Sequence, residues 1–242
     1  MNPARHPDGV AAVLLDIEGT TTPIAFVYQT LFPYVRAHLA RYLDEHAATP
    51  PMASIIDRLE RERAADPDAP PAGPIAGYLE WLMDRERKST PLKDLQGRMW
   101  EAGYRRGELI GDIFGDVPRA LTRWHDEGIG VGIFSSGSVL AQRLLFAYST
   151  SGDLTSLIRW YFDTTVGPKR EAASYRRIAD EMTIAPGSIL FVSDVVPELD
   201  AAHDAGMQTR LSIRPGNAAQ PEGHAHQIIR DFDELQLAGR PS

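Results

Sequence analysis

Residues 13–23 read VLLDIEGTTTP: an apolar run, two carboxylates one residue apart, a glycine and three threonines. A short run of apolar residues is typical of a parallel strand that is buried on both faces. Such a strand ends here at Asp16 and Glu18. In open parallel sheets, ligands bind outside the carboxyl ends of the strands, where loops from different strands converge. We therefore interpret this stretch as the first strand of an α/β core, ending at a candidate ligand site.

Further runs of strand character follow along the chain, and each is followed by small or polar residues. Their alternation with helical patterns predicts βαβ units and a parallel sheet covered on both faces. Asp116 as N-cap, Pro118 and Gly128 bracket one of the expected helices, and residues 171–182 form another. The tail after Asn217 is weakly patterned. The expected strands are residues 10–15, 129–134, 189–192 and 208–213.

About a hundred residues between the first two strands differ in character, because their apolar positions recur only at helical spacing. The proline-rich segment 66–74 separates two of the expected helices. We predict an α/β, Rossmann-like core made of residues 1–22 and 112–242, with an all-helical cap, residues 23–111, inserted after the first strand. The expected cap helices are residues 26–46, 52–65, 75–88 and 92–106.

Composition excludes several classes of protein. Apolar residues make up 43% and charged residues 24% of the 242, as in ordinary globular domains. The uncharged stretch 129–142 is shorter than the ~20 apolar residues of a membrane-spanning helix, and no secretory signal precedes the first strand. We expect no membrane partner and a cytoplasmic location. The net charge of −8 disfavours nucleic acid as a partner, and the absence of cysteine excludes thiolate metal sites.

Polar side chains gather at the other strand ends as well. Ser135 and Ser136 follow the second strand together with Gly137, Ser193 and Asp194 follow the third, and Lys169 precedes a helix. Taken singly, such residues are ordinary turn formers. Together they suit a phosphate group with a hard divalent cation: Mg²⁺ takes carboxylate and phosphate oxygens, and main-chain N–H groups at the Gly137 turn suit phosphate.

These residues also carry a family resemblance. The order DxEGT at residues 16–20, Ser-Ser-Gly, an isolated lysine, then Ser193-Asp194 with Glu198 resembles the four-motif pattern of the haloacid dehalogenase superfamily of phosphotransferases. Within that superfamily, DIEGTTTPI, FSSGSVLAQRLLF, YFDTTVGPKR and RPGNA resemble the enolase-phosphatases of the methionine salvage pathway. The likeness covers essentially the whole chain, including the cap.

The resemblance implies a role for each of these residues. Asp16 is the nucleophile that forms an aspartyl-phosphate, and Glu18 is the general acid and base, where most phosphatases of the superfamily carry an aspartate. Lys169 neutralises charge on the transferred group, and Ser135 and Ser136 contact the substrate phosphate. One Mg²⁺ per chain is held by Asp16, Asp194 and position 18, the last through either its side chain or its backbone carbonyl.

The implied reaction has two steps: enolisation of 2,3-diketo-5-methylthiopentyl-1-phosphate, then removal of phosphate to give an acireductone. The implied partner is therefore a phosphorylated small molecule, and the family resemblance favours a monomer. Glu198 either orients Lys169 or a metal-bound water, or is simply an acidic residue in the first turn of a helix. Glu18 and Ser136 are both candidates for the proton transfer of the enolisation.

Two other functions compete with this interpretation. One is a phosphatase or phosphomutase for other small molecules, which Glu18 and the TTTPI stretch disfavour. The other is a non-catalytic binding protein, which the chemically competent residues of all four motifs disfavour. Two further expectations concern packing: His224 and His226 are expected at the surface, and the apolar residues Tyr28, Phe32, Trp81, Met99 and Trp100 are expected to pack inside the cap rather than face a substrate.

Overall fold

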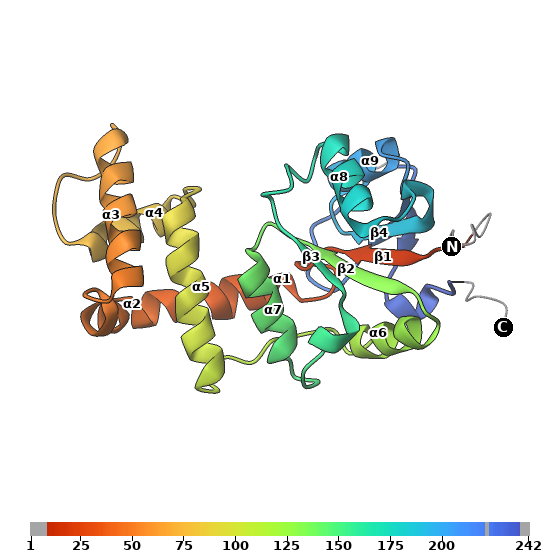
Figure 1. Cartoon of the computed structure of the whole chain (residues 1–242), viewed down its shortest axis with the longest axis horizontal. Helices are drawn as coiled ribbons and strands as arrows, with labels where there is room; N and C mark the ends of the chain where they lie inside the picture. Colours follow the sequence, from red (N-terminus) through yellow and green to blue (C-terminus); the bar gives the residue numbers. More distant parts are fainter. Residues whose placement is uncertain (1–8, 221–222, 238–242) are drawn as a thin grey trace. The chain divides into compact units, whose positions relative to one another are not determined.

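The computed structural model describes residues 9–220 and 223–237, which divide into two compact units (Figure 1). The first unit consists of the chain up to residue 27 and from residue 110 onward, and the second of residues 28–109. The boundaries predicted from the sequence fall at residues 22/23 and 111/112.

The first unit contains one parallel sheet of six strands in the order β3-β2-β1-β4-β5-β6. The first strand of the chain lies at its centre, where Leu14 pairs with Gly132 on one side and Phe191 on the other. This order places the carboxyl ends of β2, β1 and β4 next to one another, which confirms the predicted α/β core. The strands are β1 (Ala12–Leu15), β2 (Gly130–Phe134), β3 (Trp160–Phe162), β4 (Ile189–Ser193), β5 (Gln208–Ser212) and β6 (Gln227–Ile229).

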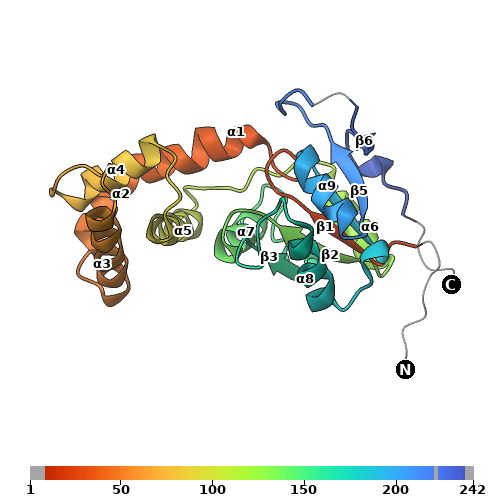
Figure 2. The ribbon, with the colours of Figure 1, turned by 90° about the horizontal axis from the view of Figure 1, so that it is seen from above.

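Helices cover both faces of this sheet (Figures 1 and 2). On one face, α8 (Ala172–Met182) and α9 (Val196–Asp204) pack on the even-numbered side chains of β1 and on Phe134 and Phe191. The other face carries α6 (Val117–Asp126) and α7 (Val139–Ala147). Because all four residues of β1 are fully buried, the strand needs apolar residues at every position, as its sequence indicates. Short 3₁₀ helices occupy Thr155–Leu157, Pro186–Ser188 and Phe232–Glu234.

The second unit is built of helices throughout its described residues. Amphipathic helices pack around one apolar core that includes Leu39, Leu59, Leu79 and Leu95. Met99 lies in this core as expected, but Tyr28 does not: it is 57% exposed, so the expectation that it packs inside the cap is wrong. The chain enters through α1 (Ile24–Phe26) and a π-helical turn (Val27–Leu31), and the unit then contains α2 (Phe32–His46), α3 (Pro50–Ala65), α4 (Ile75–Asp84) and α5 (Thr90–Arg105).

Two strands and two side chains differ from the sequence prediction. β3 and β6 are only three residues long, too short to show a hydrophobic period. Asp116 stands at the N-cap of α6, but its side chain makes no capping hydrogen bond and instead pairs with Arg214. His226 is buried rather than at the surface, because its ring bonds Asp200 at 2.9 Å and Thr209 at 2.8 Å.

No helix within residues 9–220 and 223–237 is long and apolar enough to cross a membrane.

The buried β1 strand predicts a large difference between two leucine substitutions. Leu14 has no exposed surface, whereas Leu140 on α7 is 41% exposed. We expect Leu14→Ala to lower the free energy of unfolding by about 2–5 kcal/mol, and the matched change Leu140→Ala by less than about 1 kcal/mol. Equilibrium denaturation in urea measures both. Equal losses would contradict the placement of β1 at the centre of the core.

Candidate active site

A tight turn follows β1 and fixes the direction of Asp16. The main-chain N–H of Asp16 donates to the carbonyl of Val192 on β4, so the residue is still held by the sheet. The carbonyl of the residue after Asp16, Ile17, accepts hydrogen bonds from the N–H groups of Thr20, Thr21 and Thr22 at 2.9–3.1 Å. The chain therefore curls back directly after the strand, and we call residues 17–22 the catalytic turn.

The carboxylate of Asp16 is buried and held at both oxygens. Its Oδ1 accepts a hydrogen bond from the N–H of Ile17 at 2.8 Å and lies 2.7 Å from Nζ of Lys169. Its Oδ2 accepts from the hydroxyl of Ser193 at 3.1 Å. Three fixed donors thus orient one carboxylate at the carboxyl end of the central strand, and they do so in the geometry of charge-assisted hydrogen bonds.

Lys169 joins two acidic residues from different parts of the chain. Its Nζ lies 2.6 Å from Oε2 of Glu198 as well as 2.7 Å from Asp16, and its side chain is only 9% exposed. Burial lowers the pKa of Lys169, but the charges of Asp16 and Glu198 outweigh burial, so that its pKa is raised overall. Burial also raises the pKa of Glu198. Glu198 lies in the first turn of α9 and pairs with Lys169, so both properties considered for it from the sequence are present.

Asp194 lies against the catalytic turn. A methyl group built at Gly19 would stand 2.3 Å from its Oδ2. Burial, and after it the negative charge of Asp16, raises the pKa of Asp194 to about 7, with a smaller contribution from Glu18. Asp16, Glu18 and Asp194 are therefore electrostatic neighbours. The half-buried Glu18 pairs through its backbone with Thr22 across the turn.

The site fits a divalent cation with few protein ligands. Within the described residues, no three side chains of His, Asp or Glu converge as a ready metal-binding group. Mg²⁺ does not need three, because it is usually bound by one or two carboxylates together with substrate phosphate and water. Asp16 and Asp194 supply two carboxylates whose mutual repulsion a cation would relieve. The two carboxylates thus fit the ligand chemistry of Mg²⁺.

The serines after β2 lie at the start of α7, where the structure corrects one expectation. The N–H of Gly137 is not available to a phosphate, because it donates to Oγ of Ser135 at 3.1 Å. Ser138 caps the helix by accepting from the N–H of Ala141. Ser135 is buried, whereas Ser136 is exposed. Of these serines, Ser136 is therefore the most exposed.

Known proteins resemble this chain over most of its length. The family of haloacid dehalogenase-like hydrolases matches residues 10–206. Enolase-phosphatase E1 of Synechococcus elongatus is 50% identical over 236 residues, covering 95% of this chain and 99% of that protein. Enolase-phosphatase E1 of Sorangium cellulosum is 47% identical over 224 residues, covering 93% of this chain and 96% of that protein.

This chain belongs to the enolase-phosphatases of the haloacid dehalogenase-like hydrolases. It is accordingly a phosphatase, which agrees with the resemblance found in its motifs. Among solved structures, the UTR4 protein of Saccharomyces cerevisiae is 34% identical with a TM-score of 0.79, covering 93% of this chain and 100% of that one. CbbY of Rhodobacter sphaeroides, solved in complex with phosphate, has a TM-score of 0.61, and the match covers 94% of this chain and 96% of that one. At 17% identity, this match shows likeness of fold alone.

The structure brings together most of the residues singled out in the sequence of this enolase-phosphatase. Asp16 and Lys169 are in contact, and Asp194 and Glu18 adjoin the same turn. The sequence did not indicate Gly19, nor that the Ser193 hydroxyl donates to Asp16. The signal for Ser193 was its place directly before Asp194 at the end of a strand. Gly19 stood in a run that looked like an ordinary turn.

Gly19 and Gly128 provide a matched test of the catalytic turn. Both have the positive φ that favours glycine, +70° and +72°, but a Cβ at Gly128 meets nothing within 4 Å. We expect either change to alanine to cost about 1–2 kcal/mol in backbone strain. Only Gly19→Ala displaces Asp194, and it should lower kcat for a phosphate ester by about 10²-fold. Steady-state kinetics and thermal unfolding of both variants check this, and equal kcat values would refute the close packing of Gly19 on Asp194.

Proposed function

We propose that this enolase-phosphatase converts 2,3-diketo-5-methylthiopentyl-1-phosphate, through its enol phosphate, into the acireductone 1,2-dihydroxy-3-keto-5-methylthiopentene and inorganic phosphate. The reaction belongs to L-methionine salvage. We further propose that it proceeds through an aspartyl-phosphate on Asp16 and requires one Mg²⁺ per chain, and we expect a cytoplasmic monomer. The buried Asp16 carboxylate, held by Ile17, Lys169 and Ser193, is the observation that carries the mechanism.

In the phosphatase step, a carboxylate oxygen of Asp16 attacks phosphorus while the bond from phosphorus to the substrate oxygen breaks. A carboxylate that is already ionised needs no separate base to activate it, so an aspartate can attack phosphorus directly. The ammonium group of Lys169, 2.7 Å from Asp16, neutralises charge that develops on the transferred phosphoryl group. Glu198 keeps that ammonium group in place. Ser136 contacts the substrate phosphate, and Ser135 supports the same loop.

Glu18 transfers the proton. It protonates the leaving enol oxygen as Asp16 is phosphorylated, and it then removes a proton from the water that hydrolyses the aspartyl-phosphate. Compared with aspartate, glutamate moves the carboxyl group outward by about one methylene, a shift that suits a leaving group with an extended enol. In the enolisation, Glu18 and Ser136 are the two candidates for moving the proton next to the substrate carbonyl.

Asp16, Asp194 and position 18 would hold the Mg²⁺ ion, which when bound supplies positive charge that polarises phosphoryl and carbonyl oxygens. The buried carboxylates of Asp16 and Asp194 support this assignment, because without a cation the negative charge of Asp16 disfavours that of Asp194. Lys169 provides only one positive charge against Asp16 and Glu198. Substrate phosphate would add further negative charge to this site.

The proposed reaction predicts a defined order of products. We expect the purified protein, supplied with Mg²⁺ and the methylthio diketo-phosphate, to produce enol absorbance with or before inorganic phosphate. Addition of a chelator should abolish both signals, and added Mg²⁺ should restore them. A parallel time course of absorbance and phosphate release is the measurement. Phosphate release from simple esters, with none from the diketone, would refute this substrate while leaving a phosphatase.

The proposed nucleophile predicts a further outcome. We expect Asp16→Asn to lower kcat by at least ~10³-fold, because a neutral amide cannot form the aspartyl-phosphate. The chain offers a matched control in Asp180→Asn, the same change at an exposed position of α8. Near-normal turnover by the Asp16 variant would refute the mechanism, and a thermal midpoint close to that of the control would show that it remains folded.

A further inference from the structure

The segment that follows β5 contacts the catalytic turn from a distant part of the chain. The side-chain amide of Asn217 donates through Nδ2 to the carbonyl of Gly19 at 3.0 Å. The hydroxyl of Ser212 donates to the same carbonyl at 3.4 Å. Arg214 donates through Nε to the next carbonyl, that of Thr20, at 3.1 Å. Two successive carbonyls of the turn therefore have partners about 200 residues later in the sequence.

We propose that Arg214 and Asn217 are positioning residues that hold the catalytic turn, and with it Glu18, in its place beside Asp194. The inference rests on the proposed function, because that function gives Glu18 and Asp194 their roles. Neither Arg214 nor Asn217 takes part in the proposed chemistry itself, and each acts through a main-chain carbonyl of the turn.

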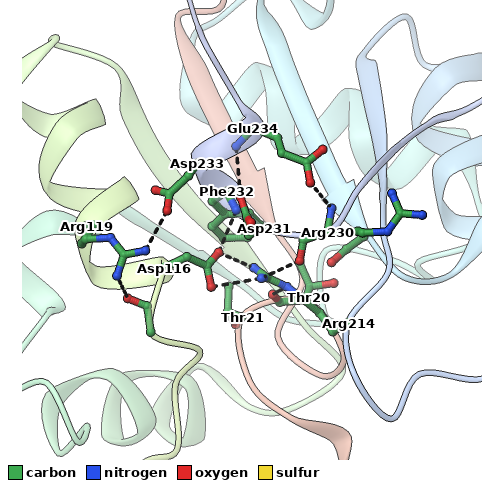
Figure 3. Close-up of polar contacts among 12 residues, drawn as sticks. Thr20, Thr21, Asp116, Arg119, Arg214, Arg230, Asp231, Phe232, Asp233 and Glu234 are labelled. Atoms are coloured by element: carbon green, nitrogen blue, oxygen red, sulfur yellow. Dashed lines mark hydrogen bonds and ion pairs between the residues drawn. The ribbon is translucent and has the colours of Figure 1, made fainter.

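Arg214 is the anchor of this support (Figure 3). Its guanidinium group is buried and makes a two-pronged ion pair with Asp116, at 3.0 and 2.7 Å. It also donates to the carbonyl of Arg230 at 3.0 Å and lies 4.7 Å from the ring centres of both Phe114 and Phe232. The planar group is thus fixed on its edges by oxygen atoms and on its faces by aromatic rings.

Asp116 ties the C-terminal segment to the same anchor. Its Oδ2 accepts a hydrogen bond from the N–H of Phe232 at 2.7 Å in addition to the contact with Arg214. This explains why the Asp116 side chain does not cap α6. Buried ion pairs contribute little net stability relative to apolar packing. Their value here lies in geometry, because the pair fixes where Arg214 meets the carbonyl of Thr20.

Asn217 is the part of the support that packs on Gly19. Its Nδ2 donates to two carbonyl oxygens, those of Gly19 and Ser212, which determines the orientation of the amide. Its Oδ1 lies 3.0 Å from the position that a Cβ of Gly19 would take, and Oδ2 of Asp194 lies 2.3 Å from that same position. Asn217 accordingly packs against the face of Gly19 that Asp194 occupies.

Catalysis should be more sensitive to this support than stability. Loss of one such hydrogen bond costs about 1 kcal/mol, which lowers the melting temperature of a chain of this size by only about 2–4 °C. In contrast, groups that orient active-site ligands commonly account for about 10- to 100-fold in activity. A residue that only stabilised the fold would show the reverse pattern.

The test compares Asn217→Ala and Asn217→Asp with Gln220→Ala. Asparagine to aspartate keeps the size, removes the amide donor and adds a negative charge, whereas alanine removes the donor without adding charge. Gln220 is the matched control, because among the residues that the structure describes its amide donates within its own loop, to the carbonyl of Ala218. Hydrogen–deuterium exchange of residues 17–22 reports the order of the turn without substrate, and phosphate release from an aryl phosphate reports the chemistry.

We expect both Asn217 variants to exchange about tenfold faster in residues 17–22 than the control, and kcat to fall about 10- to 100-fold with KM little changed. Unchanged exchange would overturn the inference, and so would kcat within twofold of the control or a loss of kcat matched by the fraction unfolded. Should the wild-type protein release no phosphate from any ester, the proposed function fails, and the exchange comparison alone decides this inference.

Discussion

The contact of one buried lysine with two carboxylates is the interaction on which the site depends. Lys169 meets Asp16 from the end of β1 and Glu198 from the start of α9, and Ser193 donates to Asp16 while lying 3.3 Å from Glu198. Charged groups are costly to bury unless they are paired and hydrogen-bonded. The parallel order of β1 and β4 meets this requirement, because it brings the ends of both strands to one point.

This arrangement leaves an excess of negative charge. Asp194 is a third buried carboxylate of the same region, and Lys169 balances only one of the three. Burial, and after it the negative charge of Asp16, raises the pKa of Asp194. A phosphate ester would be repelled by such a site, whereas a divalent cation would be attracted to it. The need for a cation under the proposed function therefore follows from the electrostatics of the protein as well as from the chemistry of phosphate transfer.

The sequence predicted the parts of this site that are marked locally. A buried strand shows as an apolar run, and its end shows as an abrupt change to polar residues; Asp16, Ser135 and Asp194 were found in this way. Contacts between distant segments leave no such local pattern. The pairing of Arg214 with Asp116 joins residues 98 positions apart, and the burial of His226 depends on Asp200 and Thr209. The short strands β3 and β6 were missed because pairing with their neighbours, rather than their own sequence, defines them.

The catalytic turn shows why such distant contacts matter. Its own main-chain hydrogen bonds end on two carbonyls, those of Ile17 and Thr22, and they curl the chain without fixing how the curl is placed against β4. Because Gly19 has no side chain, Asp194 can lie close to it, but this alone does not fix the distance between the two residues. That separation needs a contact from outside the turn. The carbonyl of Gly19 accepts such a contact from Asn217 and that of Thr20 from Arg214, which is itself held by a buried ion pair with Asp116. The polar contacts of this unit thus set positions at the rim of the sheet, while the apolar residues of β1 and its neighbours supply the stability.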